Sequence, residues 1–182
     1  STQKQTPEQH LQFDHELAVI TTHHLEETTL KVKTKMKIHR RAPLCSIEIN
    51  ADPKKTKKLI VSLRPYNPEG ISFVHQIKTV GQRHWQINNK DILSFNHRPR
   101  DQFFSEYSNG DVINNIISGR EASPEKIKCK VGLATAAAVF DIGPGQENHL
   151  KINIPLDTRK SDIKLPYPVK TQQAWQENLN DY

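Results

Sequence analysis

A strict two-residue alternation over positions 27–39 constrains the fold of this chain more than any other feature. Apolar or small side chains occupy every second position, and cationic ones the positions between: Leu30, Val32, Thr34, Met36 and Ile38 against Lys31, Lys33, Lys35, Lys37 and His39. Successive side chains of a β-strand point to opposite faces of the sheet. The pattern therefore predicts a strand with one buried face and one wet face.

Similar short patterns recur along the chain, separated by turn residues. Positions 16–22 predict a partner strand that forms a hairpin with 27–39, and Leu59–Leu63, apolar at nearly every position, predicts a central strand. Turns at Gly81-Gln82, Asn88-Asn89-Lys90 and Gly143-Pro144-Gly145 delimit further strands, expected at 45–49, 71–80, 83–87, 91–95, 126–131, 134–140 and 149–156. This spacing is typical of an all-β, antiparallel two-sheet sandwich.

The domain organisation follows from where the alternation stops. We expect one sandwich domain over 1–157 and a C-terminal linker over 158–182, with a short helix through Ala174, Trp175 and Leu179. Within the sandwich, 96–125 predicts one long loop, which could hold a short helix over 112–117.

Composition indicates a folded, soluble protein. The chain has 182 residues, 35% hydrophobic and 25% charged, which suits a single core. No apolar run approaches the roughly 18 residues needed to span a bilayer, and the polar start lacks the pattern of a signal peptide. Because position 1 is not methionine, we expect a processed chain or a piece of a longer one. Cys45 and Cys129, expected on different strands, are interpreted as free thiols in a reducing, cytoplasmic compartment, with a single disulfide left open.

The motifs of common catalytic and metal sites are incomplete. Asp14-His15-Glu16 lacks the second histidine of a zinc helix, because Val19 stands in its place, and the adjacent His23 and His24 would point to opposite strand faces. The glycine-rich turn at 143–145 lacks the lysine of a phosphate-binding loop. The loop carboxylates Glu106, Asp111 and Glu121 carry no pattern that pairs them. We predict no catalytic residue, no metal site and no cofactor.

Aromatic side chains provide the best candidates for ligand binding. Tyr66 lies in a proline-rich turn, and Phe103, Phe104 and Tyr107 lie in the expected long loop. Their flat rings could stack on sugar rings. The alternative is that Phe103 and Phe104 pin the loop to the core and that Trp85 is simply buried, and this is the favoured interpretation.

The lysine row Lys31, Lys33, Lys35 and Lys37 and the net charge of +6 permit contact with a polyanion such as a nucleic acid. The strand lacks the aromatic stacking residues of sheets that bind single strands or RNA. Outer-face lysines that oppose aggregation are the commoner explanation, so nucleic acid is the less favoured partner.

Several stretches resemble a known family. Leu59–Gly70 (LIVSLRPYNPEG), Trp85–Asn88 and Gly110–Val112 are similar to the N-terminal β-sandwich domains of glycoside hydrolases with an (α/α)6 barrel, of the glycogen-debranching and glucoamylase-like kind. Gly132–Ala136 with 143–145, and Trp175 with Leu179, extend the resemblance over most of 57–179.

The resemblance implies a large sandwich that packs against a helical catalytic domain in cis and lends the 96–125 loop to the rim of its active site. No catalytic residue carries over, because in such enzymes the acid and the base belong to the barrel. From its position in a turn, Arg64 is interpreted as structural, as are Gly70 and Asp111. Its guanidinium could satisfy several backbone carbonyls or pair with a carboxylate such as Glu69 or Asp111.

Three functions are therefore considered. The first is a non-catalytic sandwich module of a carbohydrate-active enzyme. The second is a free-standing carbohydrate-binding module that uses the loop aromatics to hold an oligosaccharide, and the third is a domain that binds nucleic acid or another polyanion through the lysine row.

Overall fold

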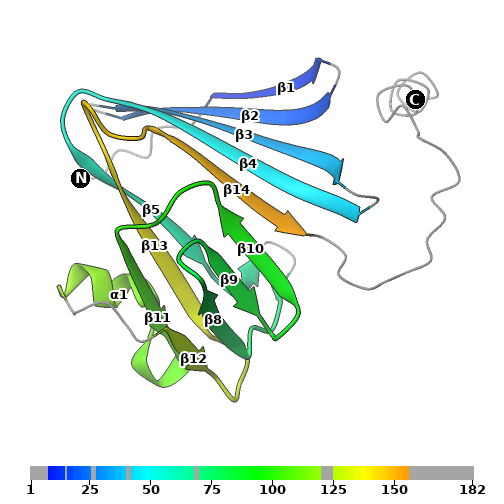
Figure 1. The fold of residues 1–182 in the computed structure, drawn as a ribbon, viewed down its shortest axis with the longest axis vertical. Coiled ribbons are helices and arrows are strands. Elements are labelled where there is room, and N and C mark those ends of the chain that lie inside the picture. The colour runs from blue at the N-terminus through cyan, green and yellow to red at the C-terminus, as the bar shows by residue number, and fades with distance from the viewer. Residues whose placement is uncertain are drawn as a thin grey trace, which may run out of the picture.

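The computed structural model describes residues 8–155 apart from positions 15, 26–27, 40–41, 68–69 and 120–124. In this part of the chain the prediction of an all-β, antiparallel two-sheet sandwich is confirmed, because every pair of neighbouring strands is antiparallel (Figure 1). The expected linker and helix at 158–182 lie outside the described residues.

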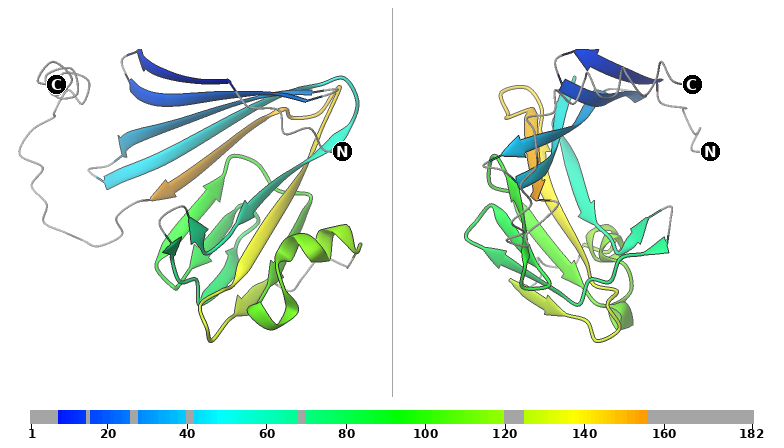
Figure 2. Two further views of the ribbon diagram at one scale, coloured as in Figure 1. Left: turned by 180° about the vertical axis from the view of Figure 1, so that it is seen from behind. Right: turned by 90° about the vertical axis from the view of Figure 1, so that its right-hand side faces the viewer.

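The larger sheet has nine strands in the order β1-β2-β3-β4-β14-β10-β9-β8-β12. Their bounds are β1 Glu8–Asp14, β2 Glu16–Leu25, β3 Thr28–His39, β4 Ala42–Pro53, β14 His149–Pro155, β10 Asp91–Phe95, β9 His84–Ile87, β8 Gln76–Val80 and β12 Lys126–Lys128. The β2–β3 hairpin that the alternation predicted is present, with Thr21 opposite Val32. Figures 1 and 2 show β1–β4 at the end of the molecule opposite α1.

The smaller sheet has three strands in the order β11-β13-β5, namely Asp101–Ser105, Thr135–Ile142 and Lys57–Leu63. The prediction that Leu59–Leu63 is a central strand is wrong, because β5 pairs only with β13 among the described strands. Its side chains alternate between half-buried and exposed, and Ile60 is largely solvent-facing. The central strand is β13, whose alanine-rich sequence is buried on both faces.

The main core fills the space between the two sheets. Its buried aromatic side chains are Trp85, Phe95, Phe104 and Phe140, in edge-to-face contacts with ring centroids 5.1 to 5.9 Å apart. Trp85 is completely buried and donates its indole N–H to Gln102 Oε1 at 2.5 Å. Aromatic pairs of this geometry add to the hydrophobic stabilisation of a core.

The expected long loop at 96–125 is more structured than predicted. It contains β11, a short 3-10 helix η1 (Tyr107–Asn109) and the helix α1 (Val112–Ile117), the last as the sequence suggested. Helix α1 covers the outer face of the smaller sheet, where Val112 and the partly buried Ile116 pack with Phe103, Ala137 and Val139. Since β11 faces the main core on one side and α1 on the other, both of its faces are buried.

Both cysteines are free thiols in the structure. Cys45 lies in β4 and is half-buried, and burial raises the pKa of its thiol. Cys129 is buried just after β12, in the connection to β13, rather than in a strand as expected.

Candidate functional site

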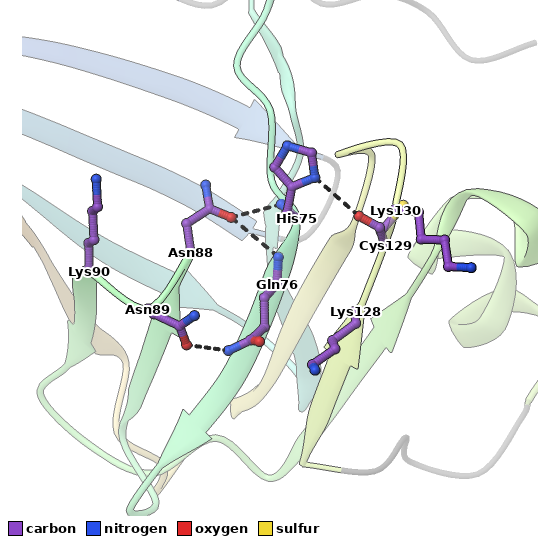
Figure 3. A pocket seen from close by; sticks show the side chains of 8 residues that line it. All are labelled: His75, Gln76, Asn88, Asn89, Lys90, Lys128, Cys129 and Lys130. Atoms are coloured by element: carbon purple, nitrogen blue, oxygen red, sulfur yellow. Dashed lines mark hydrogen bonds between the residues drawn. The ribbon is translucent and has the colours of Figure 1, made fainter.

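A cavity with a volume of about 710 Å³ opens at one end of β8. Three separate segments line it: the first residues of β8 with His75, the β9–β10 turn, and the chain around the end of β12. The lining residues are His75, Gln76, Asn88, Asn89, Lys90, Lys128, Cys129 and Lys130 (Figure 3). Its volume falls in the range of small-molecule sites, which makes it the candidate site of this chain.

The turn between β9 and β10 forms one wall of the cavity. Asn88 and Asn89 have φ values of 49° and 61°, in the left-handed region that asparagine tolerates better than most residues. The Asn88 side chain accepts hydrogen bonds from the backbone N–H groups of His75 and Gln76 at 2.7 and 3.2 Å, and donates to the Phe73 carbonyl at 2.9 Å. The turn is thereby fixed against the start of β8.

His75 lies between the two walls. Its Nδ1 is 3.3 Å from the carbonyl oxygen of Cys129, and its ring stacks on that of Phe73 with centroids 6.0 Å apart. Gly132, at φ 75°, packs beneath both rings, where an added Cβ would lie 2.8 Å from Phe73 Cδ1 and 3.0 Å from His75 Cε1. A glycine at this position lets the two rings approach the backbone.

The lining of the cavity is cationic. Lys90 and Lys128 lie on either side of Gln76, and Lys130 lies beyond Cys129 (Figure 3). None of the three lysines forms an ion pair within the part of the chain that the structure describes, and no carboxylate lines the cavity. The site therefore presents unbalanced positive charge.

Cys129 supports the cavity from behind. Burial disfavours the thiolate and alone would raise its pKa, but backbone N–H groups directed at the sulfur, those of Tyr107, Leu133, Val131 and Gly132, outweigh it and lower the pKa of the thiol. The Leu133 N–H lies 3.4 Å from Sγ. These contacts tie η1 to the chain between β12 and β13.

The arrangement suits binding of an anionic or hydroxyl-rich ligand. Lysine side chains supply charge, and the amides of Gln76 and Asn89, joined by a 2.6 Å hydrogen bond, supply donors and acceptors. Among the residues with described positions, no group of three His, Cys, Asp or Glu side chains is placed to hold a metal ion. None of the described helices is long and apolar enough to cross a bilayer.

The aromatic residues proposed from the sequence fall into a buried group and an exposed group. Phe103 and Phe104 are buried in two different hydrophobic clusters, and Trp85 is buried with Phe104. This matches the packing alternative for those three residues. Tyr66 and Tyr107 are 54% and 64% exposed, so their rings are the two of the proposed set that a ligand could reach from solvent.

Arg64 joins the end of β5 to the start of α1. Its Nη2 donates to Asp111 Oδ1 at 3.1 Å, and its Nε lies 3.0 Å from Asp111 Oδ2. Asp111 also caps α1, because its Oδ1 accepts the Ile113 N–H at 2.9 Å. Gly70, at φ 139°, pairs with Asn67 in the β6–β7 hairpin (Tyr66–Asn67 and Gly70–Ile71) that follows Arg64. Glu69, the other partner considered for Arg64, lies outside the described residues.

Replacing Asp111 with alanine is expected to lower the free energy of unfolding by about 1–2 kcal/mol, because the helix loses its N-cap and Arg64 loses its partner. Asp111→Asn retains a good capping side chain without the charge, so we expect it to lower the free energy of unfolding less than Asp111→Ala does. Urea denaturation of both variants measures the difference. Wild-type stability in Asp111→Ala would contradict a structural role for this residue.

The lysine row of β3 is partly neutralised. Lys35 is buried, and its Nζ lies 3.1 Å from Glu48 Oε1, which also lies 3.5 Å from Lys151 Nζ. Lys31 is exposed, whereas the side chain of Lys37 lies outside the described set. Because one of its lysines is buried and already paired with the partly buried carboxylate of Glu48, the row is a weaker polyanion surface than its sequence suggested.

Sequence reasoning did not identify the cavity. It placed a turn at Asn88-Asn89-Lys90 but gave no reason to bring that turn near Lys128 and Lys130. The connection is made by the pairing of β12 with β8, in which Lys128 lies opposite Gln76. The two consecutive asparagines in a turn were the one available signal.

Comparisons with known proteins support the fold class. No protein family model matches the sequence, and no curated protein does. A structure of a bacterial glucoamylase complexed with acarbose matches 96% of this chain at a TM-score of 0.52 and 10% sequence identity. This chain spans about a quarter of the length of that glucoamylase chain, with a coverage of 27%. At this identity the likeness concerns the fold alone, which is related to that of part of a glycoside hydrolase.

Proposed function

We propose that this chain is a non-catalytic β-sandwich module of a carbohydrate-active enzyme, which packs against a helical-barrel glycoside hydrolase domain in cis. The likeness to the glucoamylase carries the proposal, since nearly the whole of this chain corresponds to 27% of that protein. The remaining length of such an enzyme is available for a catalytic domain. The sandwich over 1–157 is proposed as one domain, and 158–182 as the connection to the barrel.

The β6–β7 hairpin supports this proposal as a docking surface. Tyr66 and Ile71 are opposite one another in the hairpin, and each is 54% exposed. Exposed apolar side chains that lie next to one another mark a candidate interaction surface. Arg64, which is bonded to Asp111, fixes the chain immediately before the hairpin.

An activity assay tests the non-catalytic role. The purified chain is expected to release no reducing sugar from maltooligosaccharides or other glucans. Turnover by the isolated chain that disappears when one of its own carboxylates is replaced would overturn the proposal.

The exposed rings of Tyr66 and Tyr107 favour a second candidate, a free-standing carbohydrate-binding module. Calorimetric titration with oligosaccharides tests it. Heat of binding that is lost in Tyr66→Ala and Tyr107→Ala, with the fold intact, supports this function, and no heat with any oligosaccharide removes it.

A further inference from the structure

The lysines around the cavity belong to a larger cationic group on the outer face of the nine-stranded sheet. Lys78 and Lys126 lie directly opposite one another on β8 and β12, two positions along from Gln76 and Lys128. Like charges at directly opposite positions of a sheet repel and destabilise the pairing. Neither side chain forms an ion pair within the described part of the molecule. A bound anion would relieve this repulsion.

The cavity also contains neutral groups that suit hydroxyls. The amides of Gln76 and Asn89 use one atom each in their mutual hydrogen bond, Gln76 Nε2 and Asn89 Oδ1. The other amide atoms, Gln76 Oε1 and Asn89 Nδ2, have no hydrogen-bond partner within the described residues. One acceptor and one donor side by side match a pair of neighbouring sugar hydroxyls.

A flat apolar ring lies next to the cavity, outside the residues that line it. Phe73 is 60% exposed and stacks on His75, which lines the cavity. Gly132 holds the two rings close to the backbone, as described above. An exposed ring in this position offers a surface for the C–H face of a sugar.

From these observations we propose that the cavity binds an acidic saccharide, meaning a short sugar chain that bears carboxylate, sulfate or phosphate groups. The anionic part of the ligand is inferred from the lysines alone, whereas the sugar part rests also on the proposed function. Lys90, Lys128 and Lys130 contact the charged groups, Gln76 and Asn89 the hydroxyls, and Phe73 the ring. An oligonucleotide shares the phosphate chemistry, but the local cavity, with one ring and two amides, suits a short ligand better than an extended strand.

Calorimetric titration of the full chain at low salt tests the proposal. The probes are a galacturonate trisaccharide, a sulfated chondroitin tetrasaccharide, phosphorylated maltotriose and neutral maltotriose. Inorganic sulfate, inorganic phosphate and a short single-stranded oligonucleotide are titrated for comparison. At least one acidic probe is expected to bind at least tenfold more tightly than maltotriose, with an affinity that falls as salt is added. The acidic probe that binds best identifies the charged group.

Matched variants distinguish binding in the cavity from a general effect of the net charge of the protein. The triple variant Lys90→Gln, Lys128→Gln, Lys130→Gln is expected to weaken binding at least tenfold. A control triple variant, Lys31→Gln, Lys54→Gln, Lys58→Gln, loses the same charge at exposed positions elsewhere and is expected to change affinity less than twofold. Phe73→Ala is expected to weaken the binding of the saccharide but not the binding of inorganic sulfate. Circular dichroism checks that each variant is folded.

Four results would overturn the proposal: no binding of any acidic probe, equal binding of maltotriose, an equal loss in the control triple variant, or tighter binding of a single-stranded oligonucleotide. Inorganic sulfate or phosphate that binds as tightly as the saccharides would overturn the sugar assignment. These titrations do not depend on a catalytic domain. Failure of the proposed accessory role is detected separately, by the absence of a barrel from the native protein.

Discussion

Replacing Phe104 with alanine will lower the free energy of unfolding by about 3–5 kcal/mol, because a buried aromatic ring is removed from a core that cannot fully collapse around the gap. The Phe104 side chain is 3% exposed, and its ring centroid lies 5.9 Å from that of Trp85. Urea denaturation followed by far-UV circular dichroism measures the loss.

Tyr107→Ala is the matched control, since Tyr107 lies three residues further on and is 64% exposed. Its expected effect on stability is within about 0.5 kcal/mol, as for most surface substitutions. A Phe104→Ala protein with wild-type stability but without affinity for an oligosaccharide would mean that the ring contacts the ligand rather than the core.

The second large effect concerns the ion pair of β3 and β4. Glu48→Gln will lower the free energy of unfolding by roughly 3 kcal/mol at neutral pH, because the buried ammonium group of Lys35 loses its ion pair with the Glu48 carboxylate. Lys35 and Glu48 have side-chain exposures of 9% and 19%. Thermal and urea unfolding of the variant measure the effect.

The same pair predicts how stability depends on pH. Burial alone would raise the pKa of Glu48, but Lys35 and Lys151 together lower it below its ordinary value of 4.5. Since the folded state then binds the proton less readily than the unfolded state, the contribution is complete above about pH 4.5 and is lost as the pH falls through the lowered pKa. Glu48→Gln should lack this part of the acid transition.

Asp141→Asn provides the control for an exposed pair. It removes the negative charge that pairs with Arg100, whose side chain is 54% exposed, and is expected to cost less than about 1 kcal/mol. If Glu48→Gln cost no more than Asp141→Asn, the Lys35–Glu48 pair would not contribute more to stability than an exposed ion pair, contrary to this prediction.

The fold class could be predicted because the outer strands face the core on one side only. The alternation over 27–39 correctly predicts the strand β3 but misassigns its faces near the end, because Lys35 is buried against Glu48 and Met36 is 48% exposed. The turns at 81–82 and 88–90 separate β8, β9 and β10 where expected. The central position of β13 could not be predicted in this way. Its sequence, TAAAVFDI, is apolar on both faces, as a strand covered on both sides requires.

β11 was missed for the same physical reason. Phe103 and Phe104 are adjacent and point to opposite faces, one toward α1 and one toward the main core. Two consecutive buried aromatics break the period of two, so the segment looked like a loop. Only the position of α1 over the smaller sheet, a long-range feature, explains why both rings are buried.

The cavity could not be predicted because its walls come from segments far apart in the sequence. His75, Asn88 and Lys128 are brought together by the order β9-β8-β12 in the larger sheet. That order depends on which strands pair, and the alternation within a strand does not indicate which strands are its neighbours. By contrast, Asp111 could be suggested as one of several partners for Arg64, because a guanidinium at the end of a strand can pair with a carboxylate, and the structure shows that pair.

The accessory role is tested most directly by the size and composition of the native protein that contains this chain. An antibody against the sandwich would isolate it from its source for intact mass measurement and peptide sequencing. We predict a protein much larger than the 20.9 kDa of this chain, with peptides of a helical-barrel glycoside hydrolase in the same polypeptide. A native species of 20.9 kDa without such a domain would contradict the account.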